Sequence, residues 1–180
     1  MSADLPREPD RAAIATFVEA LFRYADDGTF LSLRAFCQSD HGQTPPLIRG
    51  VQVDGEGLGL LIDSAVAAAG FAANAREPMV FCPPIATFCN DTRATEEALA
   101  CGLSLSVELD RGNTQRARER LEGLLGPATV VVASGGNIID SVTGTELPKL
   151  HLHWRLSEPT RDAEGPRQAE ASASYRLRPR

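Results

Sequence analysis

The stretch Leu103-Ser-Leu-Ser-Val-Glu-Leu-Asp110 alternates apolar and polar residues without interruption. A period of two is typical of a β-strand that packs one face on a core, because successive side chains point to opposite faces of the sheet. The pattern places the apolar residues on the inner face and the polar ones on the outer face. We therefore expect Glu108 and Asp110 to stand side by side at the end of this strand.

A second segment, Lys149-Leu-His-Leu-His-Trp-Arg-Leu156, alternates in the same way. Its leucines and its tryptophan are predicted to face inward. The opposite face then carries four side chains that are cationic or can become so. These are Lys149, His151, His153 and Arg155.

Helical periodicity marks three further segments. Apolar residues recur every three or four positions over residues 14–22, and Asp10 can cap the start of this helix. A second helix is predicted over residues 58–69, and a third follows its N-cap Asn113 and stops at Gly126-Pro127. The inward residues predicted for the third helix are Ala117, Leu121, Leu124 and Leu125.

Strands are also predicted at residues 29–38, 48–53, 79–82 and 128–133, and the last is a β-branched run that suits a strand buried on both faces. Because helices and strands alternate, the simplest fold is α/β or α+β, with helices covering one sheet. Residues 157–180 are rich in Glu, Arg, Ala, Ser and Pro. Such a composition predicts a polar, disordered tail, which leaves residues 1–156 as the folded domain.

Composition limits the class of protein. The chain has 180 residues, 43% of them apolar and 23% charged, with a net charge of −6, which fits one globular domain. It has no apolar run long enough to span a membrane and no secretory signal at its N-terminus. We therefore expect a cytoplasmic protein that does not associate with a membrane. Its acidic balance argues against a general nucleic-acid coat protein but leaves a local basic groove open.

The four cysteines show no metal-binding or disulfide spacing and are predicted to be buried thiols, at positions 37, 82, 89 and 101.

The two alternating strands suggest a shared chemistry. Two neighbouring carboxylates repel each other, and a divalent cation such as Mg²⁺ or Mn²⁺ commonly offsets this repulsion. The basic side chains of residues 149–156 can bind phosphate oxygens. The segment Ala133-Ser-Gly-Gly-Asn137 adds glycines that let the backbone approach a ligand, and Ser134 can donate to a phosphate. Together these features predict a nucleoside triphosphate site. The alternative is that both polar strand faces are simply solvated and that Ser-Gly-Gly is a hairpin turn.

Residues 81–160 resemble the archaeo-eukaryotic primase (primase-polymerase) superfamily, in particular the RepB-like primases of plasmids, phages and integrative elements. Glu108-Leu-Asp110 matches its first motif, and Ser134-Gly-Gly136 with His151-Leu-His-Trp154 matches its second. The resemblance implies that Glu108 and Asp110 bind the catalytic Mg²⁺ or Mn²⁺. It implies that Ser134 and His151 contact the phosphates of the nucleotide, and that His153 occupies the place of an aromatic residue. The glycine segment and the basic strand face add the other predicted nucleotide-binding residues, which are Gly135, Gly136, Lys149, His153 and Arg155.

The resemblance further implies a primase-polymerase-like sheet covered by helices and a DNA primase function. The reaction would be metal-dependent nucleotidyl transfer for primer synthesis during replication of a mobile element. Nucleoside triphosphates, a single-stranded DNA template and a replicative helicase would be its partners. The superfamily's third motif, an acidic residue on a later strand, has no counterpart before Arg180, so we expect a catalytic domain truncated at its C-terminus. Two alternatives remain: an inactive remnant that binds nucleotide or DNA, and a plain α/β interaction domain.

Overall fold

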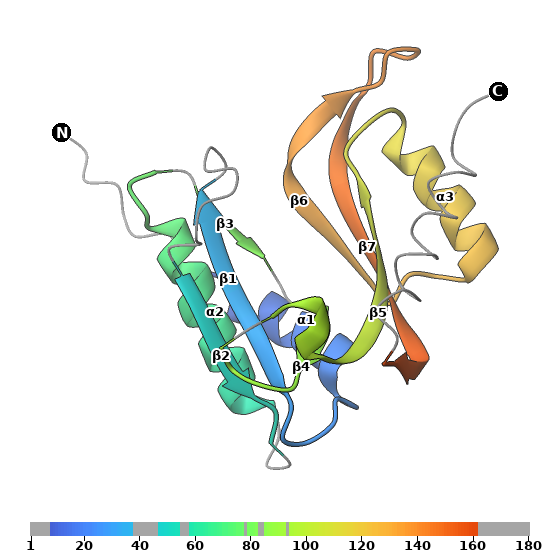
Figure 1. The fold of residues 1–180 in the computed structure, drawn as a ribbon. Coiled ribbons are helices and arrows are strands. Elements are labelled where there is room, and N and C mark those ends of the chain that lie inside the picture. The colour runs from blue at the N-terminus through green and yellow to red at the C-terminus, as the bar shows by residue number, and fades with distance from the viewer. Residues whose placement is uncertain are drawn as a thin grey trace. The chain divides into compact units, whose positions relative to one another are not determined.

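The computed structural model describes residues 8–37, 47–54, 58–77, 79–82, 85–92 and 94–161. The chain divides into two compact units, Met1–Gly102 and Leu103–Arg180, which are described in turn. Helices and antiparallel strands together form an α+β fold, which confirms the predicted fold class. Figure 1 shows the elements of each unit with their labels. Most of the predicted tail, residues 162–180, lies outside the described residues.

The first unit is organised around strand β1 (Phe30–Cys37). Every second residue of β1 is buried, from Leu31 to Cys37, as the alternation of a half-covered strand requires. Strand β1 pairs antiparallel with β2 (Leu47–Gln52), β3 (Met79–Cys82) and, through Phe30, β4 (Ala86–Phe88). A single 3₁₀ turn, η1 (Glu96–Ala98), precedes the next strand.

Helices α1 (Arg11–Phe22) and α2 (Gly59–Ala73) complete the first unit. Asp10 caps α1 as predicted, because its carboxylate accepts a 3.0 Å hydrogen bond from the backbone N of Ala13. Helix α2 packs against β1, β2 and β3, and α1 packs against α2 (Figure 1). The contact with the sheet is close because α2 presents small residues, Ala65 and Ala68, to Leu33 of β1.

Strand β5 (Leu99–Leu109) begins in the first unit, where its first residues pair with β4, and continues into the second. Within the second unit the strand order is β5-β7-β6. Strands β6 (Val130–Ile139) and β7 (Glu146–Thr160) form a long antiparallel hairpin, seen in orange and red in Figure 1. Strand β7 therefore starts before the predicted Lys149 and ends after the predicted Leu156.

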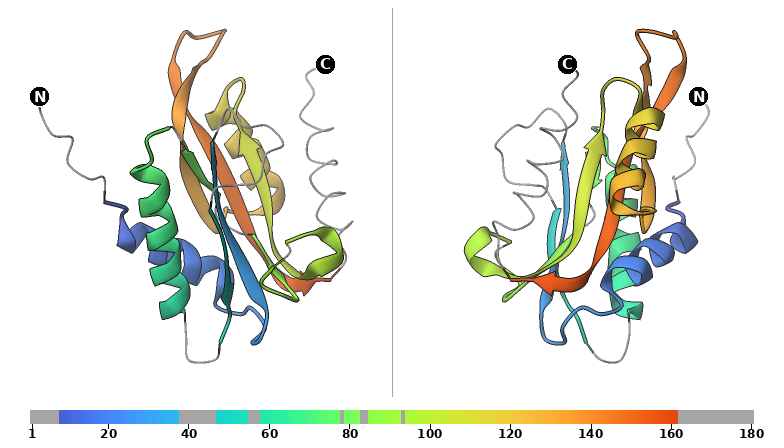
Figure 2. Two further views of the ribbon diagram at one scale, coloured as in Figure 1. Left: turned by 60° about the vertical axis from the view of Figure 1, so that its left-hand side comes forward. Right: turned by 90° about the vertical axis from the view of Figure 1, so that its right-hand side faces the viewer.

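Helix α3 (Thr114–Leu125) covers one face of the second unit's sheet. Its N-cap is Asn113, as predicted, which accepts a 2.8 Å hydrogen bond from the backbone N of Arg116. Figure 2 shows α3 running along β7. The core between them consists of Leu109, Leu121, Leu150, Leu152 and Trp154, so Leu150, Leu152 and Trp154 of β7 face inward as expected. Leu156, predicted on the same face, is half-buried and does not belong to this core.

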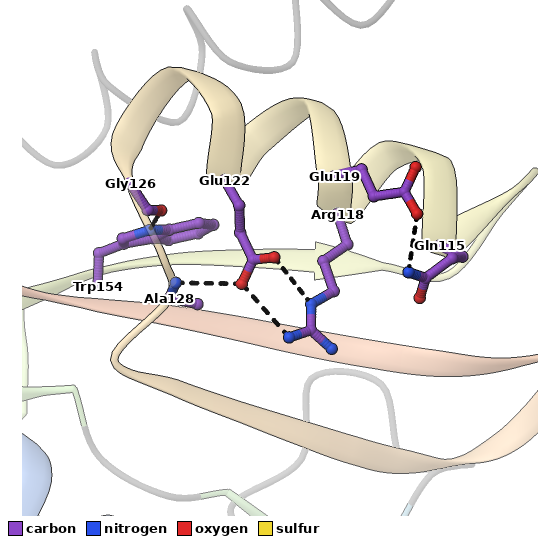
Figure 3. Close-up of polar contacts among 7 residues, drawn as sticks. All are labelled: Gln115, Arg118, Glu119, Glu122, Gly126, Ala128 and Trp154. Atoms are coloured by element: carbon purple, nitrogen blue, oxygen red, sulfur yellow. Dashed lines mark hydrogen bonds and ion pairs between the residues drawn. The ribbon is translucent and has the colours of Figure 1, made fainter.

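The end of α3 is fixed by the hydrogen bonds of two side chains, Glu122 and Trp154 (Figure 3). The carboxylate of Glu122 accepts hydrogen bonds from the guanidinium of Arg118 and, at 3.2 Å, from the backbone N of Ala128. The Ala128 N–H and the Arg118 guanidinium hold the pKa of Glu122 below its usual value. The indole of Trp154 donates a 2.9 Å hydrogen bond to the carbonyl of Gly126, which ties the helix end to β7.

Two predictions about this unit are wrong. Leu124 and Leu125 were expected to face the core, but they are 59% and 46% exposed. The indole of Trp154 already lies at this end of the helix, so the last turn projects its leucines outward. The run over residues 128–133 was expected to be buried on both faces. It is only partly buried because β6 is the last strand in the described order of the sheet.

Candidate functional site

The face of the second unit's sheet that α3 leaves uncovered carries a row of polar side chains, here called the polar ladder. It consists of Ser106 and Glu108 on β5 and of Lys149, His151 and His153 on β7. The Oγ of Ser106 lies 2.6 Å from Nδ1 of His153, and Oε1 of Glu108 lies 3.1 Å from Nε2 of His151. The two pairs share one antiparallel register, in which each step forward on β5 is a step back on β7.

The Ser-Gly-Gly segment lies beside the same ladder. It was expected to be a loop, but it is a bulge within β6, because the strand resumes at Asn137. Ala133 pairs with Leu150 and Asn137 with Pro148, so Ser134, Gly135 and Gly136 together oppose Lys149 alone. All three are exposed, and both glycines have left-handed backbones, with φ of 85° and 79°.

The hairpin also returns His151 to the bulge, although the two are far apart in sequence. His151 pairs with Val132, two residues before Ser134. A Cβ placed on Gly136 would lie 3.8 Å from Cδ of Lys149, so the side chain of the lysine passes close to the bulge. The structure thus brings the Ser134–Gly136 bulge, Lys149, His151 and Glu108 into one place.

The contact between Glu108 and His151 is not an aligned hydrogen bond. Nε2 of His151 is buried and makes no hydrogen bond to any residue that the structure describes. The side chain of Glu108, by contrast, is 62% exposed. A buried ring nitrogen without a hydrogen bond is unusual in a folded protein, and the exposed carboxylate of Glu108 is the charged group that lies against it.

His153 differs sharply from His151. Only 3% of it is exposed, and burial, followed by the charge of His151, lowers its pKa to about 4. His153 is therefore neutral at neutral pH, with Nδ1 engaged by Ser106. The sequence placed His153 on the correct face but gave no sign of its burial. It also gave Ser106 no role, because the role depends on which residue of β7 lies opposite.

The other predicted site residues lie further out. Asp110 follows the last residue of β5, and its Oδ1 is 3.7 Å from Nε of Arg111. Arg155 is exposed, and its backbone N donates to Oγ1 of Thr129. Nothing in the described geometry brings Arg155 to the bulge.

The predicted metal ligands, Glu108 and Asp110, offer two exposed carboxylates. Among the described residues there is no group of three or more His, Cys, Asp or Glu side chains arranged to hold a metal ion. Two carboxylates fit a cation that takes its remaining ligands from water and from the phosphates of a nucleotide, as Mg²⁺ commonly does.

A buried acid that sequence reasoning missed, Asp140, holds the hairpin to α3. Its carboxylate accepts hydrogen bonds from the backbone N of Val142 at 2.9 Å and from the side-chain amide of Asn113 at 2.6 Å. These two contacts, in that order, hold the pKa of Asp140 below its usual value. Oγ1 of Thr114, fully buried, donates to the carbonyl of Pro148, next to Lys149. The start of α3 therefore fixes the part of β7 that faces the bulge.

Comparisons of the chain with protein-family models, with curated proteins and with solved structures gave no match. No helix in the described part of the chain is long and apolar enough to cross a membrane.

Proposed function

We propose that the polar ladder and the Ser134–Gly136 bulge bind the triphosphate of a nucleotide for metal-dependent nucleotidyl transfer, in the manner of a DNA primase. The observation that carries the proposal is the buried Nε2 of His151, which makes no hydrogen bond within the described residues. The same strand carries Lys149, two residues before His151, and the bulge lies opposite Lys149. A phosphate oxygen is an acceptor suited to an imidazole N–H.

The bulge supports the same role. Its residues have no partner on β7 other than Lys149, so their backbone N–H groups lie outside the regular ladder. Both glycines have left-handed conformations and lie beside a lysine. Backbone N–H groups in such a setting are suited to binding an anion. The exposed hydroxyl of Ser134 adds a further donor.

The proposed cation is Mg²⁺ or Mn²⁺, held by Glu108 and Asp110 together with the phosphates. When bound, it would offset the charge of the triphosphate and favour in-line attack of a 3′ hydroxyl on the α-phosphate, with the bond to the β-phosphate broken and pyrophosphate released. Glu108 has to leave His151 before a phosphate oxygen can reach Nε2. In the complete reaction a single-stranded DNA template pairs with the incoming nucleotide, and a replicative helicase of the mobile element exposes that template in the cytoplasm.

Nucleotide binding is the first test. Titration calorimetry with ATP and dATP in Mn²⁺ is expected to show binding that His151→Gln and Lys149→Gln each weaken about tenfold, as expected for the loss of one charge-assisted hydrogen bond. Glu158→Gln is the matched control, because Glu158 is an exposed residue of the same strand away from the ladder. Equal affinities for all variants would place nucleotide elsewhere on the chain.

Primer synthesis is the second test. Labelled nucleotides, Mn²⁺ and a single-stranded template are expected to give short products that disappear in Glu108→Gln with Asp110→Asn. Binding without product supports the alternative function, a remnant that holds nucleotide without turnover. The two exposed carboxylates, Glu108 and Asp110, suit that alternative because they can bind a cation together with the phosphates of a held nucleotide. Neither binding nor product would leave a plain interaction domain and overturn both.

A further inference from the structure

Building on the proposed nucleotide site, we propose that Ser106 and His153 form a positioning pair that fixes the ring of His151 and that neither residue touches the nucleotide. The sequence pattern had grouped His153 with the phosphate contacts. Its burial and its hydrogen-bonding partner assign it a different task.

Ser106 and His153 make a short contact across the two strands. At 2.6 Å, the separation of Oγ and Nδ1 is that of a strong hydrogen bond. The hydroxyl of Ser106 donates to Nδ1 or accepts from it, according to the tautomer, and in either case the contact fixes the orientation of the ring. Ser106 therefore determines how the edge of the His153 ring is presented to its neighbours.

The rings of His151 and His153 are also in contact. Their ring centroids lie 6.4 Å apart with the planes at 71°, an edge-to-face arrangement within the range of attractive aromatic pairs. Glu108 contacts His151 at Nε2, 3.1 Å away. The ring of His151 is thus held between a fixed neutral ring and a movable carboxylate.

The charge of His153 also matters for the site. Because His153 is buried and neutral, it adds no positive charge beside His151 and does not compete for the phosphates. When Glu108 moves away, the contact with His153 remains. The orientation of His151 then depends on His153, and through His153 on Ser106.

The test uses two serines of one strand. Ser106→Ala is expected to weaken ATP affinity in Mn²⁺ about fivefold, whereas Ser106→Thr, which keeps the hydroxyl, retains most of it. Ser104→Ala is the matched control. Ser104 lies on the same face of β5 and is also buried, but its hydroxyl makes no hydrogen bond within the described residues. Equal losses for Ser106→Ala and Ser104→Ala would overturn the proposal.

A second readout needs no nucleotide. In ¹⁵N-histidine NMR spectra of the ligand-free chain, Ser106→Ala is expected to move the ring nitrogens of His153 and also those of His151, whereas Ser104→Ala moves neither. Unchanged His151 signals would overturn the positioning pair even if nucleotide binds. If the wild type binds no nucleotide but the His151 signals do move, the proposed function fails and the pair stands. If Ser106→Ala does not fold, Ser106→Cys replaces it in both measurements, because a thiol is a similarly small but weaker donor.

Discussion

His153 shows at the scale of one residue how burial changes chemistry. Its pKa, lowered to about 4 from 6.5, means that the folded chain binds a proton less readily than the unfolded chain does. Protonation therefore favours unfolding. The contribution of His153 is fully present above pH 6.5 and is lost progressively as the pH falls toward 4.

We accordingly expect the free energy of unfolding to fall between pH 7.5 and pH 5, by at most ~1.4 kcal/mol per pH unit from this group. Urea denaturation of the wild type and of His153→Gln at several pH values in this range measures the effect. The variant should be less stable at pH 7.5 but show a flatter dependence. Parallel curves would mean that His153 titrates alike in the folded and unfolded chains. Staying above pH 5 limits the contributions of Asp140 and Glu122, whose pKa values are also lowered.

The sequence could predict which residues share a face but not which residues meet. Alternation alone placed Glu108 and His151 on polar faces. Their contact depends on the pairing of β5 with β7 and on its register, which no local spacing encodes. Ser106 was overlooked for the same reason. Asp140 was overlooked because its partner, Asn113, lies at the start of α3, far away in sequence.

At the scale of the element, α3 separates what periodicity predicts well from what it predicts poorly. Its start was predicted because an N-cap is a local signal. Its last turn was not predicted correctly. The apolar stripe continues through Leu124 and Leu125, although Trp154 already occupies the core at this end of the helix. Strand β6 was predicted too short for a related reason. Paired glycines usually signal a turn, and only pairing with β7 shows that the strand resumes beyond them.

Two leucines of α3 provide a test of this description. Leu121 is 2% exposed and belongs to the core, so Leu121→Ala is expected to destabilise the chain by about 2–5 kcal/mol. Leu124→Ala removes the same atoms from a residue that is 59% exposed and should change stability by less than ~0.5 kcal/mol. Urea denaturation at constant pH measures both. A comparable loss in the two variants would show that the outer face of α3 is covered in solution.

At the scale of the whole molecule, the fold class followed from the alternation of helices and strands. The division into two units did not, because a single strand, β5, runs through it: the alternating pattern begins only at Leu103, but the strand begins at Leu99. The prediction of buried thiols was also made for the chain as a whole. It is confirmed for Cys37 and Cys101 and wrong for Cys89, which is exposed. The side chain of Cys82 lies outside the described residues.

These thiols can report on unfolding. With a maleimide under native conditions, we expect rapid labelling of Cys89 and labelling of Cys101 only after β5 opens, because Cys101 is 2% exposed. The rate at Cys101 should rise with urea, whereas the rate at Cys89 should hardly change. Peptide mass spectrometry distinguishes the sites. Comparable rates at the two thiols in the absence of urea would show that the start of β5 opens readily.

The bulge in β6 has a consequence for insertions and deletions. Three residues there face one on β7, so the strand has two residues more than the ladder needs, and an even surplus leaves inner and outer faces in phase on both sides. Deleting Gly135 alone should turn every side chain beyond it to the wrong face and destabilise the hairpin. Deleting Gly135 and Gly136 together restores the phase and should give a folded chain, detectable by its cooperative urea transition, that lacks the proposed phosphate site. Insertions and deletions in this strand therefore preserve its inner and outer faces only when they involve an even number of residues.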